Sequence, residues 1–88
     1  MNDIERLKQK ALRLTKSPGV YTMKDVNDKM IYVGKAKVLK NRVVSYFRNF
    51  SSQNEKVRKM VSNVEDFDFI LTDSEFEALI FEADLISI

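Results

Sequence analysis

The sequence contains no cysteine and no histidine in its 88 residues. Without cysteine the chain forms no disulfide, and without either residue it lacks the usual ligands of a structural zinc site. Nucleophilic catalysis by a cysteine–histidine pair is excluded, as is every nuclease mechanism that uses a histidine base. Any proton transfer in a reaction would therefore fall to tyrosine, lysine, a carboxylate or a metal-bound water.

Long apolar stretches are also missing. No run approaches the roughly 18 residues that a membrane-spanning helix needs, and the charged start, "MNDIERLKQK", lacks the apolar centre of a signal peptide. We therefore expect a cytoplasmic protein with no membrane partner. A length of 88 residues predicts a single domain, 1–88, with one core.

The two signs of charge are unevenly distributed. Residues 1–50 carry 12 lysines and arginines against 4 acidic residues (net +8), whereas residues 51–88 carry 3 against 9 (net −6). Either the two halves attract each other in the folded domain, or a basic surface binds a polyanion while acidic residues elsewhere hold a cation. Charge alone favours the first interpretation.

Proline and glycine are scarce, with one proline and two glycines. The pair Pro18–Gly19 therefore marks the main break in the chain. Before it, residues 3–15 are predicted to form a helix with one apolar face, made of Ile4, Leu7, Ala11 and Leu14. We expect this N-terminal helix, within residues 1–16, to cover a core formed by residues 17–88.

After the break, residues 19–24 and 30–35 are rich in β-branched and aromatic residues and flank the polar turn "DVNDK". This pattern predicts a β-hairpin. Because side chains alternate along a strand, Tyr21 shares a face with Met23, and Tyr32 shares a face with Met30 and Gly34. The sequence does not fix the register, so it leaves open whether the two tyrosines meet.

The apolar period then changes to that of a helix. From Val38 one stripe contains Leu39, Val43, Phe47 and Phe50, and Arg42 and Tyr46 lie beside it. Residues 51–64 are predicted to form a serine-capped helix whose apolar residues are Val57, Met60, Val61 and Val64, and residues 66–72 a third strand. The final helix, over 73–86, begins with a capping box of Ser74 and Glu77. We expect it to bury Phe76, Leu79, Ile80 and Ala83, with Glu82 beside them. The predicted fold class is α+β, a small three-stranded antiparallel sheet flanked by helices.

Six polar or titratable residues are predicted to lie beside core faces: Tyr21, Tyr32, Lys35, Arg42, Tyr46 and Glu82. Such a set suits a phosphodiester, with an arginine gripping phosphate oxygens, a lysine as a point charge, a glutamate on Mg²⁺ and a tyrosine acting on water. The alternative is ordinary structure, with half-buried tyrosines and a solvated arginine and glutamate. Lys35 and Lys37 favour the functional interpretation, because cations at a helix start are unfavourable unless an anion binds there.

Four segments together carry a resemblance: "GVY" at 19–21, "YVG" at 32–34, "KAKVLKNRVVSYF" at 35–47 and "SEFEALIFEADLI" at 74–86. They resemble the GIY-YIG nuclease family, and the likeness covers nearly the whole chain, from about Ser17 to Ile86. Within that family the match is closest to the N-terminal nuclease domain of the bacterial nucleotide excision repair excinucleases. The family fold is a three-stranded antiparallel sheet with surrounding helices, as the residue pattern also predicts.

The resemblance implies residue roles by position. Tyr21 and Tyr32 match the two motif tyrosines, and Tyr32 is the better candidate for the general base. Tyr46 matches the tyrosine of the "SYF" element, and Glu82 the glutamate that binds the single divalent metal. The residues implied in DNA or phosphate binding are Gly34, Lys35, Lys37, Lys40 and Arg42.

The resemblance also implies a reaction, which is hydrolysis of a DNA phosphodiester on the 3′ side of a lesion. The cofactor would be one Mg²⁺ or Mn²⁺ ion, and the B component of the ABC excinuclease would present the damaged double-stranded DNA. Two other functions remain open: a DNA-binding or docking module that does not cut, and a small free-standing nuclease with other substrates. The complete set of Tyr32, Lys35, Arg42 and Glu82 favours the nuclease. Because segments typical of the family's longer members are absent from the sequence, we expect an isolated domain or a short free-standing relative.

Overall fold

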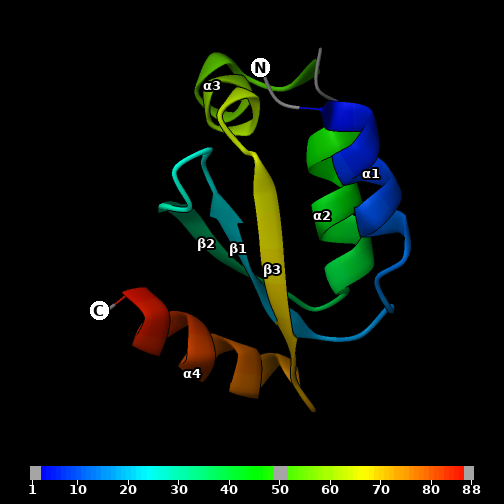
Figure 1. The fold of residues 1–88 in the computed structure, drawn as a ribbon. Coiled ribbons are helices and arrows are strands. Elements are labelled where there is room, and N and C mark those ends of the chain that lie inside the picture. The colour runs from blue at the N-terminus through cyan, green and yellow to red at the C-terminus, as the bar shows by residue number, and fades with distance from the viewer. Residues whose placement is uncertain (1–2, 49–51, 87–88) are drawn as a thin grey trace.

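The computed structural model describes residues 3–48 and 52–86. Its elements are, in order, α1 (Ile4–Leu12), β1 (Gly19–Lys24), β2 (Met30–Ala36), α2 (Leu39–Arg48), α3 (Glu55–Ser62), β3 (Asp66–Leu71) and α4 (Glu75–Ile86). The predicted element order and the α+β class are confirmed (Figure 1). In the described part of the chain, no helix combines the length and the apolar character needed to cross a membrane.

The three strands form one antiparallel sheet in the order β2-β1-β3, so β2 is an edge strand. The register answers the question that the sequence left open. Tyr21 pairs with Gly34 and Met23 pairs with Tyr32, which makes the two tyrosines diagonal neighbours on one face. The ladder then shifts by a bulge between Met23 and Lys24.

The hairpin turn depends on a single aspartate. The Asp25 carboxylate accepts hydrogen bonds from the backbone N–H groups of Asn27 (2.9 Å) and Lys29 (3.0 Å). Asp28 takes a positive φ of 63°, a conformation that aspartate tolerates better than most residues. The polar turn predicted between the strands is therefore stabilised by its own side chains.

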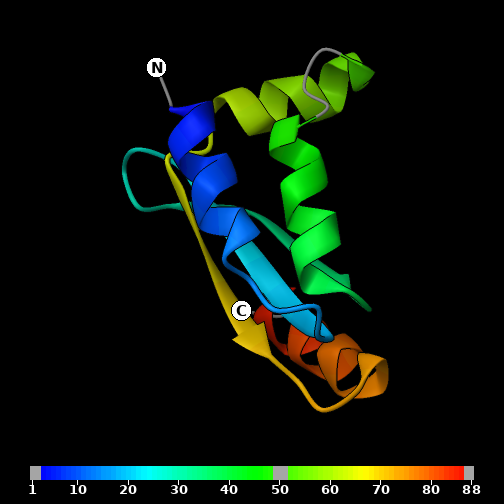
Figure 2. The ribbon, with the colours of Figure 1, turned by 90° about the vertical axis from the view of Figure 1, so that its right-hand side faces the viewer.

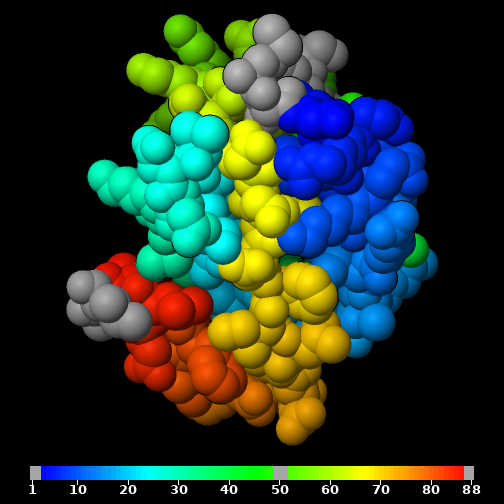
Figure 3. All heavy atoms as spheres, in the orientation of Figure 1, coloured from blue at the N-terminus to red at the C-terminus, as the bar shows by residue number. Residues whose placement is uncertain are grey.

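The main core lies between the sheet and the helices α1, α2 and α3. Figures 1 and 2 show α1 and α2 side by side on one side of the sheet, with α4 apart from them. In the space-filling view, β3 fills the space between α1 and the hairpin (Figure 3). The largest core side chains with no exposed surface are Tyr21, Phe67, Leu7, Met23, Leu39, Val43, Val61 and Val64.

Three of the four predicted faces agree with this core. Leu7, Ala11 and Leu14 of the first helix are buried, as are Leu39, Val43 and Phe47 of the second and Val61 and Val64 of the third helical stretch. Phe50 lies outside the described residues. The predicted serine cap is wrong, because α3 begins later, at Glu55, and its N-cap is Asn54, whose side chain accepts from the Val57 N–H at 2.9 Å.

Polar contacts attach α1 to β3. The Lys10 ammonium donates to the Asp66 carboxylate (2.8 Å) and to the Phe67 carbonyl (2.6 Å), and it lies 4.6 Å from the centre of the Phe67 ring. Arg6 donates to the Glu65 carbonyl at 2.6 Å. The first helix therefore belongs to the folded unit.

The "SPG" break connects three elements. The Ser17 carbonyl accepts from the Leu39 N–H (2.9 Å), and the Pro18 carbonyl accepts from the Thr72 N–H (3.0 Å). At Gly19 a β-carbon would lie 2.6 Å from the Ile70 carbonyl oxygen, so this close approach requires glycine. These contacts fix the start of α2 relative to the segment that leads into α4.

The predicted core face of α4 is wrong. Phe76, Leu79 and Ile80 are exposed by 71%, 45% and 47%, and Ala83 is also exposed. The buried residue is Ala78, which has no exposed surface, and Glu82 lies one turn further along the same face. The Ser74 cap is confirmed, because its hydroxyl accepts from the Glu77 N–H at 3.1 Å.

Candidate active site

One cleft collects side chains from four separate segments. Its volume is about 300 Å³, and it lies at β2, one of the two edge strands of the sheet. We call it the edge cleft. It is lined by Tyr21, Tyr32, Gly34, Lys35, Ala36, Lys37, Arg42, Glu75 and Glu82.

The position of β2 at the sheet edge explains how this set assembles. Successive residues of a strand point to opposite faces, so Gly34 and Lys35 contribute from different sides of the sheet. An edge strand has no neighbour on its outer side, so both faces open onto one space. Arg42, one turn into α2, and Glu82 of α4 complete the cleft from different elements.

The charged side chains that line the edge cleft do not neutralise one another. Among residues 3–48 and 52–86, Lys35, Lys37 and Arg42 form no ion pair, and neither do the two glutamates. Three cations and two carboxylates therefore share one cleft with their charges available. Such an arrangement suits an anion on the basic side and a cation on the acidic side.

Glu75 is a cleft residue that the sequence interpretation missed. It lies seven residues before Glu82 on the same helix, two turns away and therefore on the same face. This spacing was the available signal, but the resemblance drew attention to Glu82 alone. Within the described residues there is no group of three His, Cys, Asp or Glu side chains that could hold a metal ion. A cation here would have at most two carboxylates, with water completing its coordination, as is usual for Mg²⁺.

Three tyrosines pack together beside the cleft. Their ring centroids are 6.1 Å apart for Tyr21 and Tyr32, 5.8 Å for Tyr21 and Tyr46, and 6.3 Å for Tyr32 and Tyr46. The hydroxyls of Tyr21 and Tyr46 are hydrogen-bonded at 2.7 Å. Tyr21 has no exposed surface, whereas Tyr32 is 40% exposed, so Tyr32 is the phenol that reaches solvent in the cleft.

Burial and the neighbouring phenols keep two of these tyrosines protonated. Burial first, then the hydrogen bond to Tyr46, raises the pKa of Tyr21 far above its ordinary value. Burial also raises the pKa of Tyr46, although the hydrogen bond from Tyr21 favours its anion and partly opposes that rise. We infer that Tyr21 donates its proton to the Tyr46 oxygen, because Tyr21 is the more deeply buried phenol.

Gly34 is required by a packed side chain. A β-carbon at this position would overlap the phenol ring of Tyr21, its cross-strand partner. The space beside Gly34 is therefore taken by a side chain of the neighbouring strand. Gly34 therefore fixes where the Tyr21 hydroxyl lies.

Two predicted residues lie outside the edge cleft. Lys40 lines a separate hollow of about 140 Å³ with Leu12 and Arg48, on the side of α2 near α1. Tyr46 supports the cleft from behind through its bond to Tyr21. The structure thus brings Tyr21, Tyr32, Gly34, Lys35, Lys37, Arg42 and Glu82 into one place, and it does not bring Lys40 there.

Residues 17–88 match a family model described as the UvrC-like GIY-YIG domain. The sequence is similar to UvrABC system protein C of Clostridium tetani, with 59% identity over 83% of this chain and 12% of that protein. It is 52% identical to UvrABC system protein C of Acetivibrio thermocellus over 91% of this chain and 13% of that protein. The chain thus spans about one eighth of the length of these curated relatives.

The fold is similar to crystal structures of the GIY-YIG N-terminal endonuclease domain of UvrC from Thermotoga maritima. One of them contains the domain bound to its catalytic divalent cation, magnesium. It superposes with a TM-score of 0.82 at 38% identity, over 94% of this chain and 89% of the other. A variant of that domain in which one tyrosine is replaced by phenylalanine, also bound to its catalytic divalent cation, superposes with a TM-score of 0.81.

Proposed function

The chain belongs to the family of UvrC-like GIY-YIG domains, and from that premise we propose that it is a metal-dependent DNA endonuclease domain. The observation that carries the proposal is the edge cleft, where Tyr32, Lys35, Arg42 and Glu82 come together from β2, α2 and α4. Metal-dependent hydrolysis of a phosphodiester uses this combination of cations, a water-directing group and a metal ligand around one phosphorus atom.

Lys35 and Arg42 bind the scissile phosphate. The guanidinium group of Arg42 presents a planar set of donors that suits two phosphate oxygens at once, and the Lys35 ammonium acts as a compact charge. Because neither forms an ion pair within the described residues, binding a phosphate does not require breaking one. As negative charge builds up on the phosphate oxygens, these two cations stabilise it.

Tyr32 directs the attacking water. It is the exposed phenol of the three and lines the cleft together with Arg42. Tyr21 and Tyr46 hold its ring in place through packing at 6.1 Å and 6.3 Å between ring centroids. Tyr21 has no exposed surface and its hydroxyl is bonded to that of Tyr46, so the role of base falls to Tyr32, the exposed phenol.

Glu82 holds the divalent cation, with Glu75 at the same face of α4 as a second carboxylate for it or for its water ligands. Oxygen donors in an open, water-filled cleft suit Mg²⁺ or Mn²⁺. When bound, the ion supplies stabilisation of negative charge on the leaving oxygen. The solved relative, bound to magnesium, supports this choice.

The relatives named UvrABC system protein C support a finer proposal. We propose that this domain makes the incision on the 3′ side of a lesion in damaged double-stranded DNA, in the cytoplasm. The B component of the same ABC excinuclease is the proposed partner that presents the DNA.

The test is the substitution Glu82→Gln, with Arg42→Ala as a second variant, in the complete excision reaction with Mg²⁺ on a duplex that carries one lesion. Both variants are expected to lose 3′ incision by at least about 100-fold, the usual effect of removing one group that stabilises the transition state. Both should keep the unfolding temperature of the wild type, because neither side chain lies in the core.

The matched control is Asp84→Asn, which removes the same charge from an exposed position on the same helix. It is expected to cut at the wild-type rate. Incision by Glu82→Gln at the wild-type rate would overturn the assignment of the metal site. Wild-type protein that binds the damaged duplex but does not cut it would show a binding module in place of a nuclease.

A further inference from the structure

A second hollow adjoins the edge cleft at Tyr32. It has a volume of about 460 Å³ and lies between β2 and α3, lined by Ile31, Tyr32, Tyr46, Lys56, Val57 and Met60. Tyr32 lines both spaces. The phenol that we place next to the attacked phosphate is therefore also a wall of this neighbouring hollow.

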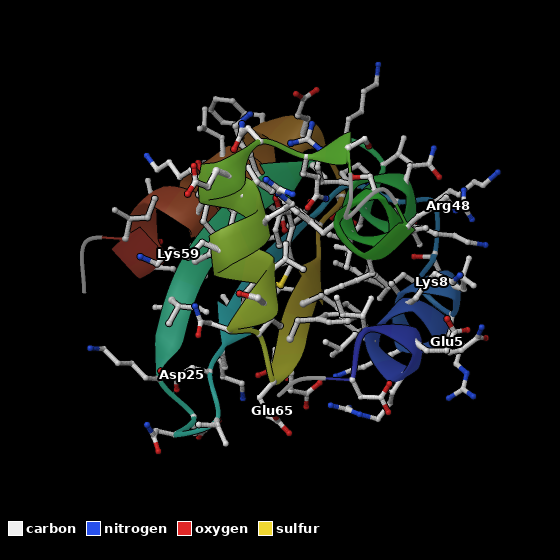
Figure 4. The ribbon with its side chains drawn as sticks, turned by 90° about the horizontal axis from the view of Figure 1, so that it is seen from above. Glu5, Lys8, Asp25, Arg48, Lys59 and Glu65 are labelled. Carbon is white, nitrogen blue, oxygen red and sulfur yellow. The ribbon has the colours of Figure 1, made fainter. Side chains whose placement is uncertain are left out.

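The hollow continues toward the hairpin turn. A third space of about 520 Å³ shares Ile31, Lys56 and Met60 with it and adds Lys59 and Asn63 of the α3 side. Figure 4 shows Lys59 on the side of α3 that faces β2, with Asp25 at the turn beyond. Together these two spaces form a groove along the edge strand, which we call the β2–α3 groove.

The lining of the β2–α3 groove combines two chemistries. Its floor is apolar and aromatic, formed by Ile31, Tyr46, Val57 and Met60. Its rim carries Lys56 and Lys59, both exposed, and neither forms an ion pair within the described part of the chain. These two lysines lie three residues apart on one helix and are therefore neighbours on its surface.

The combination matches a nucleic acid strand. Strands that are not base-paired are bound by aromatic and apolar surfaces that take the faces of bases, beside cations that follow the backbone. The volume lies within the range of sites that hold a small flat ligand. The far end of the groove carries Asp25, whose carboxylate is bonded to the turn amides. This negative charge sets the limit of a favourable phosphate track.

We propose that the β2–α3 groove binds the nucleotide next to the scissile phosphate, with its base on the apolar floor and the backbone phosphates beyond it on Lys56 and Lys59. The proposal rests on the nuclease function proposed for the edge cleft and names the part of the substrate that this neighbouring surface takes. The base must leave its partner strand to reach the floor, so the groove favours substrates that are unpaired at the cut.

The experiment measures binding without cutting, by fluorescence anisotropy of the Glu82→Gln protein on a labelled duplex with a short unpaired segment. Adding Lys56→Gln and Lys59→Gln together should weaken binding by roughly ten-fold and make the plot of log affinity against log salt shallower by about 1.4, or about 0.7 for each phosphate that is no longer neutralised. The control adds Lys8→Gln on α1 and Arg13→Gln at its C-cap, two cations that line none of these spaces. It should match the parent in both measurements.

A second series replaces single nucleotides of the probe by abasic sites on either side of the expected cut. One position should weaken binding by at least roughly five-fold, within the range measured when one stacked base is lost. The proposal is overturned if the groove variant and the α1 control variant behave alike, or if no abasic position has an effect. Because these are binding measurements, their outcome is separate from incision. If the wild-type protein cuts DNA but the groove variants bind normally, the nuclease function stands and the proposed role of the groove is wrong. If the protein does not cut DNA but its binding needs Lys56 and Lys59, the role of the groove in binding stands and the nuclease function is wrong.

Discussion

At the scale of single residues, Gly34 and Tyr21 act as one unit. The glycine leaves room for the Tyr21 ring on the neighbouring strand, and the Tyr21 hydroxyl then bonds to Tyr46 on α2. Each of these three residues belongs to a different element. The two short motifs of the hairpin are thus explained by packing against each other, and Tyr32 lines the cleft with 40% of its surface exposed.

This buried pair predicts a dependence of stability on alkaline pH. The pKa of Tyr21 is raised by burial and by its bond to Tyr46, so the folded state holds this proton more tightly than the unfolded state. The contribution of Tyr21 is complete below its ordinary pKa of 10.0 and is lost as the pH rises above that value. We expect the free energy of unfolding to fall between pH 8 and pH 11, measured by urea denaturation.

In Tyr21→Phe the same fall should be smaller, whereas the stability at pH 8 should drop by about 1 kcal/mol through loss of the hydrogen bond. A residual fall is expected, because ion pairs with Asp68 and Asp28 raise the pKa of Lys24 and act in the same direction. An equal fall in both proteins would show that the buried tyrosine does not control the alkaline limit.

At the scale of elements, α4 shows that the apolar pattern of a sequence does not always identify the buried face of a helix. The sequence "EFEALIFEADLI" has large apolar residues around most of the helix, so the period alone does not select the buried face. Ala78 is the residue buried against the sheet, because a small side chain lets the helix approach the sheet closely. Phe76, Leu79, Ile80 and Phe81 remain exposed, as do Phe69, Ile70 and Leu71 of β3.

The corrected orientation of α4 makes a clear prediction for stability. Phe76→Ser should change the free energy of unfolding by less than about 0.5 kcal/mol, as for other exposed positions, because Phe76 is 71% exposed. Ala78→Leu should cost about 1–3 kcal/mol, because it overfills a closed contact with the sheet. Urea denaturation measures both. If Phe76→Ser lowers the free energy of unfolding by about 3–5 kcal/mol, the usual cost for a buried phenylalanine, then Phe76 is buried, as the sequence predicted.

Elements with a strong period or clear turn chemistry were predictable from the sequence. The hairpin around Asp25 and the buried stripe of Leu39, Val43 and Phe47 are confirmed. The contacts that make the site were less accessible. The meeting of Tyr21 and Tyr32 depends on the strand register, and Glu75 enters the cleft only because of the face that α4 turns toward the sheet.

At the scale of the whole molecule, the opposite charges of the two halves attract each other in the folded domain. Two ion pairs join the halves at β3, between Lys10 and Asp66 at 2.8 Å and between Lys24 and Asp68 at 2.8 Å. Burial opposes the charged form of Asp66, but the Lys10 ammonium and the Phe67 N–H keep the pKa of that carboxyl below its ordinary value. The charged residues of the edge cleft form no ion pair among the described residues. The first interpretation of the charge distribution is confirmed at β3, and the second remains part of the proposed function of the edge cleft.

The N-terminal helix α1 also contributes to the stability of the whole molecule. It precedes residues 17–88, which match the family model, but it is part of the core. Leu7 has no exposed surface, so Leu7→Ala should lower the free energy of unfolding by about 2–5 kcal/mol. Thermal unfolding followed by circular dichroism should show a fall of about 4–8 °C for each kcal/mol. The control is Gln9→Ala, at an exposed position of the same helix, which should change the free energy by less than about 0.5 kcal/mol. Because Leu7 does not line the edge cleft, its variant should still cut DNA at temperatures where it is folded. Equal stability of the two variants would mean that residues 17–88 fold without support from α1.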